Sequence, residues 1–270
     1  MKKSLLILMS IASLWSCKNE QKKEVEENAE QAEAVIMEEN SGEVKHPADF
    51  EVTPIEHASA VFTWDGKVFY IDPVGGAEMY KGQPQPDVVL VTDIHGDHLN
   101  NETLNAVITD STSILAPQAV LDKMEGKAKS LTKVIANGET INWEGFMIEA
   151  IPMYNLREEA KQFHTKGRGN GYVISKDSYK VYFSGDTEDI PEMRELKDIN
   201  KAFVCMNLPY TMTVDKAAEA VLDFAPDQVY PYHFRGQDGM SDVDKFKKLV
   251  NAGNPDIEVV MLNWYPNAKK

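Results

Sequence analysis

The chain has 270 residues, and its 43 acidic and 28 basic side chains give a formal net charge of −15 at pH 7. A nucleic-acid-binding surface would need a basic face, so this balance excludes nucleic acid as the expected partner. The sequence contains two cysteines, of which Cys17 belongs to the leader described below and Cys205 lies in an apolar run. We therefore expect no disulfide within the folded domain and a core position for Cys205.

The first 17 residues have the pattern of a bacterial lipoprotein signal. Lys2 and Lys3 precede an apolar run that ends at Trp15 and is too short to span a membrane as a helix. The run leads into Leu14-Trp15-Ser16-Cys17, which resembles a lipobox. We predict that residues 1–17 are the signal, that a lipid on Cys17 anchors the protein to a membrane, and that the protein is extracytoplasmic. Trp15 is unusual in a lipobox, which leaves a secreted or periplasmic soluble protein as the alternative.

Residues 18–47 are rich in Glu, Lys, Gln and Ala and contain no Phe, Trp or Tyr. Such a segment buries too little apolar surface to offset its ordering entropy, so we expect a disordered tether. Residues 48–270 are enough for one large domain with a single buried core. The predicted organisation is therefore a signal, a tether and one folded domain.

Short apolar runs bounded by turn residues predict the strands of this domain. In the first half they are Phe50–Thr53, Ala60–Trp64, Lys67–Ile71, Val88–Val91, Ser113–Leu115, Lys133–Ile135 and Met147–Met153. In the second half they are Gly171–Ser175, Val181–Phe183, Ala202–Met206, Gln228–Tyr230 and Glu258–Leu262. Helices are expected after an N-cap at Asn100 or Asn101 and near Gln118–Met124, Pro191–Leu196, Val214–Phe224 and Asp242–Val250.

The most informative stretch follows the predicted strand Val88–Val91. Within six residues the chain carries two carboxylates and two imidazoles, those of Asp93, His95, Asp97 and His98. Positions two apart in extended backbone point the same way, so Asp93 and His95 are expected to face one metal ion together. Gly96 permits a sharp bend, after which Asp97 and His98 are expected to turn towards a second ion. Packing explains these side chains poorly, because each would need its own buried partner.

This motif resembles the His-x-His-x-Asp-His signature of the metallo-β-lactamase superfamily, with Asp93 in place of the first histidine. The segments Glu56-His57-Ala58-Ser59 and Ile71-Asp72-Pro73 resemble the ascorbate-6-phosphate lactonase-like branch of that superfamily. The resemblance runs from about Phe50 to the C-terminus. It implies an α+β fold, the four-layer αββα sandwich, which the two strand-rich halves with their helices fit. In that fold the ligand-bearing loops would meet along one edge of the sheets.

The resemblance also implies a set of metal ligands. One ion would be held by Asp93, His95 and His164, and the other by Asp97, His98 and His233, with Asp186 as the bridging carboxylate. Asp97 and Asp186 are the residues expected to take part in catalysis. Such nitrogen and oxygen ligands favour two divalent ions, zinc first, with manganese or iron as alternatives because Asp93 adds an oxygen donor. His57 matches an early histidine of the branch and is expected to line the site or bond to a loop, not to bind metal.

Two metal ions that share a water lower its pKa and polarise the group it attacks, so the predicted enzyme is a hydrolase that uses a metal-bound hydroxide. No serine or cysteine triad and no phosphate-binding glycine loop competes in the sequence. The segment from Tyr154 to Gly171 has a local excess of Lys and Arg around His164, which indicates an anionic substrate group. Together with the resemblance to the lactonase-like branch, this makes a small anionic lactone or ester the predicted substrate. The residues expected to bind it are Arg168, Arg235, Tyr210 and His57.

Two other functions stay open at this stage. A membrane-anchored phosphodiesterase of lipid head groups, resembling N-acylphosphatidylethanolamine phospholipase D, would suit a lipid on Cys17. A non-catalytic metal-binding module is the other alternative. The substitution at Asp93 keeps a ligand-type side chain and the other ligand positions match the superfamily pattern, which counts against the module. The sequence leaves the oligomeric state open.

Overall fold

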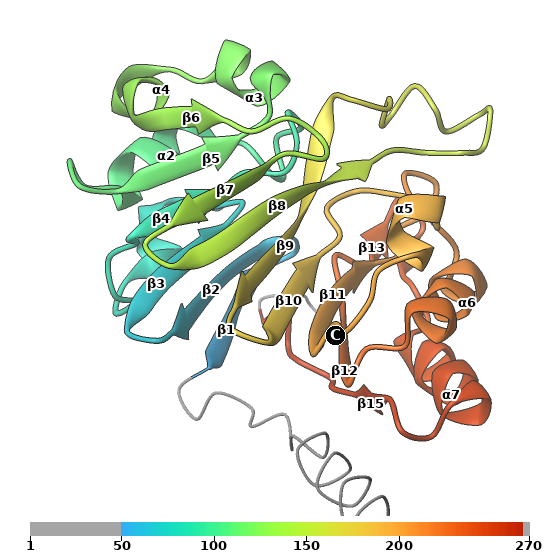
Figure 1. Cartoon of the computed structure of the whole chain (residues 1–270). Helices are drawn as coiled ribbons and strands as arrows, with labels where there is room; N and C mark the ends of the chain where they lie inside the picture. Colours follow the sequence, from blue (N-terminus) through green and yellow to red (C-terminus); the bar gives the residue numbers. More distant parts are fainter. Residues whose placement is uncertain (1–49, 267–270) are drawn as a thin grey trace, which may run out of the picture. The chain divides into compact units, whose positions relative to one another are not determined.

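Two β-sheets lie at the centre of the protein, which we describe from a computed structural model covering residues 50–266 (Figure 1). The predicted signal peptide, the lipid site at Cys17 and the predicted tether over 18–47 lie outside these residues. Between residues 50 and 266, no helix is long and apolar enough to cross a membrane.

The first sheet has six strands in the order of the sequence. They are β1 (Glu51–Glu56), β2 (Ser59–Trp64), β3 (Lys67–Ile71), β4 (Val88–Leu90), β5 (Ser113–Ala116) and β6 (Thr132–Val134). The first three pair antiparallel as hairpins, and β3 to β6 run parallel. Because β3, β4 and β5 are parallel, their carboxyl ends open at the same edge, which is where the Asp93–His98 motif begins.

The second sheet has the order β15-β12-β11-β10-β9-β8-β7. Its strands are β7 (Thr140–Trp143), β8 (Phe146–Met153), β9 (Gly169–Lys176), β10 (Tyr179–Phe183), β11 (Lys201–Cys205), β12 (Gln228–Tyr232) and β15 (Glu258–Val259). Strands β7 to β10 are antiparallel neighbours, whereas β10, β11, β12 and β15 run parallel. A small hairpin of β13 (Arg235–Gly236) and β14 (Gly239–Met240) follows β12.

Helices cover the outer faces of the two sheets (Figure 1). Beside the first sheet lie η1 (Ala77–Tyr80), α2 (Asn101–Val107), α3 (Gln118–Lys123) and α4 (Gly126–Leu131), and beside the second lie α5 (Pro191–Arg194), α6 (Val214–Phe224) and α7 (Val243–Gly253). Asn100, Thr213 and Asp242 cap their helices by accepting the backbone N–H three residues on. The predicted αββα sandwich is confirmed.

Side chains that alternate along the strands of the first sheet pack into two separate cores, one between the two sheets and one between the first sheet and its helices. Phe62 and Phe69 point between the sheets, and the Phe62 ring stacks on Phe183 of the second sheet with centroids 5.6 Å apart. Val61 and Tyr70, their neighbours in sequence, point the other way into a cluster closed by the helices α2, α3 and α4. Burial on both faces explains why the inner strands β2, β4 and β5 are mostly apolar, whereas the edge strands β1 and β6 are half-exposed and carry polar residues.

The structure differs from the predicted elements in a few places. The last strand covers Glu258–Val259, not the predicted Glu258–Leu262, since only these two residues pair with β12. Strand β7 and helix α4 were not predicted from the sequence. Both are short and half-exposed, so their apolar periodicity is weak and tertiary pairing decides their structure.

Candidate metal centre

The predicted site residues come from loops that follow strands of both sheets. Asp93, His95, Asp97 and His98 follow β4, Asp186 follows β10, and His233 follows β12. His164 lies in the long connection between β8 and β9, and His57 in the tight turn between β1 and β2. Carboxyl ends of parallel strands gather at one edge of a sheet, and here the two sheets bring their edges together.

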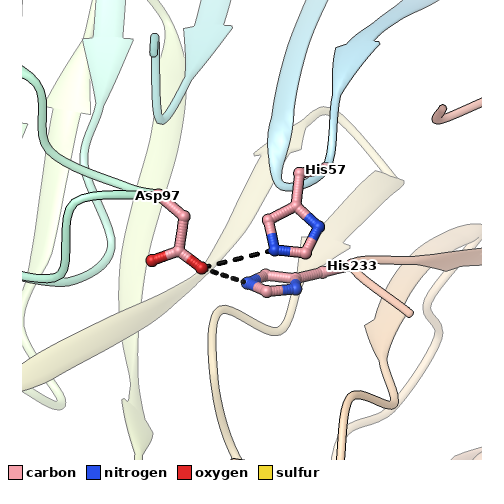
Figure 2. A group of neighbouring side chains, drawn as sticks. All are labelled: His57, Asp97 and His233. Carbon is pink, nitrogen blue, oxygen red and sulfur yellow. Dashed lines mark ion pairs between the residues drawn. The ribbon is translucent and has the colours of Figure 1, made fainter. Parts of the chain in front are cut away.

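Ligand-type side chains form three groups at this edge. Within each group, the potential ligand atoms all lie within 4.8 Å of one another. The first is Asp93, His95 and His164, the second is His98, Asp186 and His233, and the third is His57, Asp97 and His233. The seven predicted ligands therefore lie together. The grouping differs from the predicted one at Asp97. This residue was expected beside His98 and His233, but it groups with His57 and His233 (Figure 2), and its Oδ1 lies 3.9 Å from His98 Nε2.

Asp186 lies at the centre of the cluster and is 2% exposed. Its Oδ2 is 3.3 Å from His98 Nε2 and 3.2 Å from His164 Nε2, and its Oδ1 is 3.1 Å from His233 Nε2. Burial opposes ionisation of this carboxyl, but the positive charges of His233 and His98 and the close approach of the His164 and His98 imidazoles hold its pKa well below the usual range. A carboxylate between imidazoles from different loops is in the position of a bridging ligand.

The polar atoms at the centre fit a divalent cation. His164 Nε2 and Asp186 Oδ1 are buried, and their close approaches to Asp186 and His233 do not have hydrogen-bond geometry, so both atoms are unpaired. His98 Nε2 and His233 Nε2 face each other at 3.1 Å, where two lone pairs would repel unless a cation or proton lies between them. Buried unpaired polar atoms are costly, and imidazole and carboxylate together are a donor set that suits zinc.

Two of the imidazoles are oriented by acceptors at their other nitrogen. His98 Nδ1 lies 2.8 Å from Asp72 Oδ2, and Asp72 also accepts from the backbone and side chain of Thr92. His164 Nδ1 lies 3.1 Å from the carbonyl oxygen of Tyr210. Such partners accept a hydrogen bond from Nδ1–H, which keeps the proton on Nδ1 and leaves the Nε2 lone pair to bind metal. Asp72 was not among the predicted site residues, although Asp-Pro at a strand end was the available signal.

Three of the eight non-glycine residues with positive φ between residues 50 and 266 lie at the same edge. His57, Asp72 and His233 adopt left-handed φ values of 57°, 43° and 46°. Non-glycine residues avoid this region, and such conformations persist where the surrounding structure imposes them. Here the backbone bonds Asp72 N to Leu90 O, His57 N to Trp264 O and His233 N to His57 O impose them.

Arg168 and Asp93 form a buried pair that the sequence did not predict. The Arg168 Nε lies 3.1 Å from Asp93 Oδ1 and its Nη2 lies 2.9 Å from Asp93 Oδ2, a bidentate contact between side chains that are 16% and 0% exposed. Asp93 Oδ2 also lies 2.8 Å from His95 Nδ1. Asp93 therefore offers one carboxylate to a guanidinium and to the metal site at once, and Arg168 reaches a substrate only if it leaves Asp93.

The remaining predicted substrate-binding residues lie around the cluster. The Arg235 side chain is 43% exposed, with its guanidinium 5.0 Å from the ring centre of Tyr265 and only a loose approach of 4.0 Å to Glu56. Tyr210 contacts His164 through its backbone carbonyl, while its ring packs edge-on against Phe163. The His57 ring lies against that of His233, with ring centres 3.9 Å apart and planes tilted by 52°. Burial lowers the pKa of His57 to about 4, so its imidazole is neutral at neutral pH.

Cys205 has no part in this site. It is buried in the core, and burial raises the pKa of its thiol to about 12. A thiol of that kind is a poor nucleophile, which agrees with the core position expected from its apolar run.

Comparison with known proteins identifies the family. The profile of the "Beta-lactamase superfamily domain" matches residues 51–233. The chain belongs to this superfamily. A UPF0173 metal-dependent hydrolase of Methanopyrus kandleri is 29% identical over 221 residues, which cover 78% of this chain and 96% of that protein. A similar hydrolase of Pyrococcus horikoshii is 28% identical over 214 residues, which cover 76% and 92%.

Solved structures of the superfamily agree. A candidate metal-dependent hydrolase from Parabacteroides distasonis is 37% identical with a TM-score of 0.70, covering 78% of this chain and 92% of that one. Igni18, a metallo hydrolase of Ignicoccus hospitalis, shares the fold at 20% identity with a TM-score of 0.65, covering 79% and 94%. These comparisons confirm the predicted superfamily, the predicted fold and the prediction that the protein is a metal-dependent hydrolase.

Metal binding should weaken on acidification. Burial lowers the pKa of His98, but the carboxylates of Asp186, Asp72 and Asp97 raise it more, so in the metal-free protein its pKa lies well above the usual value. A metal ion must displace that proton, and the competition grows as the pH falls. We expect zinc affinity, measured by competition with a chromophoric chelator, to fall steadily from about pH 8 to about pH 5. An affinity that is constant across this range would contradict the assignment of His98 as a ligand.

The double role of Asp93 gives a second test. Asp93→Ala should reduce the metal content by the ion next to His164, and it should also destabilise the fold by about 3 kcal/mol because Arg168 keeps a buried unpaired charge. The double variant Asp93→Ala/Arg168→Met should lose the same ion without that loss of stability, as followed by elemental analysis and denaturant unfolding. Asp93→His with Arg168→Met should keep the ion. If the double variant retains the full metal content, Asp93 serves only as the partner of Arg168.

Proposed function

We propose that the protein hydrolyses a small anionic lactone or ester with two divalent metal ions, zinc in the first instance. The observation that carries the proposal is the central position of Asp186 among His98, His164 and His233, with unpaired buried atoms facing one another. Asp93 and His95 complete the ligands on one side, and Asp97 does so on the other.

Two such ions, when bound, polarise the group under attack and lower the pKa of the attacking water. The chain's own residues supply the rest of the mechanism. Asp97 has a side chain that is 41% exposed, so it is the carboxylate on the open side of the cluster and the one placed to accept a proton from water. Asp186 is almost fully buried and keeps the imidazoles of three loops in register.

The difference in ion pairing between the two arginines supports an anionic substrate. Arg168 already has both oxygens of Asp93 as partners, whereas Arg235, two residues after His233, has no partner closer than 4.0 Å among the carboxylates of residues 50–266. The ring of Tyr265 holds its guanidinium in place. Arg235 is therefore the better residue to bind a carboxylate or phosphate of the substrate.

Hydrolysis assays on the metal-loaded protein test this function directly. We expect turnover of an anionic lactone or carboxyl ester, and Arg235→Met should raise its KM about tenfold or more, as the loss of a bond to a charged group predicts. A neutral analogue should be unaffected, and Lys216→Met, which removes an exposed positive charge on α6, should behave as wild type. Turnover of phosphodiesters alone would favour the head-group phosphodiesterase instead. Equal activity after removal of all metal would refute the proposal.

We also propose that the enzyme acts outside the cytoplasm, with residues 1–17 as a lipoprotein signal, residues 18–47 as a tether and residues 48–270 as the hydrolase domain. The support is the sequence pattern around Cys17, which places a lipid attachment site some thirty residues before β1. A tether of that length would let the site work near a membrane surface.

Fractionation of cells tests the anchor. Cys17→Ala should move the protein from the membrane to the soluble fraction, because the lipid has no other attachment site, and it should keep the activity of the domain. Cys205→Ala is the matched control, since it removes the other cysteine and should stay with the membrane. A wild-type protein found only in the soluble fraction would replace the lipoprotein assignment with simple secretion.

A further inference from the structure

The hydroxyl of Tyr265 has three hydrogen-bonding neighbours next to the metal centre. It accepts the backbone N–H of Phe234 at 3.0 Å and that of Arg235 at 2.9 Å. Its third neighbour is His57 Nδ1, at 2.8 Å. Two N–H donors use the acceptor capacity of a phenol oxygen, and a tyrosine phenol keeps its proton at neutral pH. The hydroxyl proton therefore points at His57 Nδ1.

This contact decides which nitrogen of His57 carries a proton. A protonated Nδ1 would bring a third donor to the Tyr265 oxygen, so Nδ1 must be the acceptor. A neutral imidazole that accepts at Nδ1 carries its proton at Nε2. His57 Nε2 faces Asp97 Oδ2 at 3.3 Å (Figure 2), and a nitrogen that carries a proton has no lone pair for a metal ion.

The neighbouring histidines have the opposite arrangement. His98 Nδ1 faces the carboxylate of Asp72, and His164 Nδ1 faces the carbonyl of Tyr210. The amide nitrogen of Asn155 also lies 3.2 Å from His164 Nδ1, but it donates its hydrogens to the carbonyls of Ala160 and Tyr210. The acceptors on Asp72 and Tyr210 therefore place the proton on Nδ1 and the lone pair on Nε2, towards Asp186. The fold thus distinguishes the histidines by the chemistry of the group that meets Nδ1.

We propose that His57 is not a metal ligand but a positioning residue, whose Nε2–H holds the carboxylate of Asp97 in place, and that Tyr265 fixes the tautomer this requires. Asp97 has the most exposed carboxylate of the ligand set. Its Oδ2 also lies 3.5 Å from His233 Nε2, but that nitrogen faces the metal centre, so His57 is the neighbour whose N–H can hold Asp97 without competing for an ion. Tyr265 lies beyond residues 51–233, so this device comes from outside the segment matched to the superfamily profile. The inference rests on the proposed function only through the metal ion next to Asp97.

Nitrogen NMR of the full-length protein, with ¹⁵N-labelled histidine, reads the tautomer directly. We expect His57, assigned by its loss in His57→Gln, to be protonated at Nε2 and unprotonated at Nδ1. After loading with ¹¹³Cd, the ring nitrogens of His98 and His164 should show coupling to cadmium, and those of His57 should show none. A protonated Nδ1 in His57, or coupling of its Nε2 to cadmium, would overturn the proposal. Neither measurement depends on a substrate, so failure of the proposed reaction would not affect it.

Variants separate positioning from ligation. His57→Gln and His57→Ala should both keep the wild-type metal content, and the glutamine, which retains an N–H donor, should keep more of the activity than the alanine. Tyr265→Phe removes the hydroxyl that donates to His57 Nδ1, so the proton of His57 should no longer be confined to Nε2. The control is Tyr70→Phe, which loses a hydroxyl bonded to the Pro84 carbonyl in the first sheet and should leave the tautomer of His57 unchanged. Loss of one metal ion in both His57 variants would show that His57 is a ligand.

Discussion

The buried carboxylate of Asp186 is the constraint on which the site depends. It contacts imidazoles from three separate loops and lies where solvent does not reach, so its charge must be balanced by the groups around it. A divalent cation held by these residues would balance that charge and satisfy the unpaired atoms at the same time. The strand ends of both sheets, the positive φ values at His57 and His233, and the outer partner Asp72 all serve to hold these groups against one another.

The sandwich makes this convergence possible because the ligand loops are attached to strands of a tightly packed core. Aromatic rings continue from one sheet to the next, from Phe62 to Phe183 and from Phe183 to Phe203, with centroids 5.6 Å and 4.2 Å apart. Of the strands that carry these rings, β10 leads into the loop of Asp186, and β2 begins directly after the turn that holds His57. Interiors of this density resist displacement, so residues from distant parts of the sequence keep their mutual distances. Loops on such a scaffold are free to vary in their substrate contacts.

The departure of this chain from its superfamily is local and is compensated. Asp93 replaces the usual histidine and would add negative charge beside the metal, but Arg168 neutralises part of it through a bidentate contact. The same pairing occupies Arg168 and leaves Arg235 as the more accessible cation near His233. One substitution in the motif thus changes both the charge at the cluster and which arginine has a carboxylate partner.

The sequence by itself determined the strand pattern, the superfamily and the order of the ligand-type residues, because alternation of apolar side chains and a six-residue motif are local properties. It did not determine that Arg168 pairs with Asp93, 75 residues away, or that Tyr265 meets His57 across 208 residues. Short half-exposed elements such as β7 were missed for a related reason, since their structure depends on neighbours that pair with them. Only the tertiary structure decided which partner each imidazole meets, because hydrogen-bond partners are selected by position in space and leave no periodic signal in the chain.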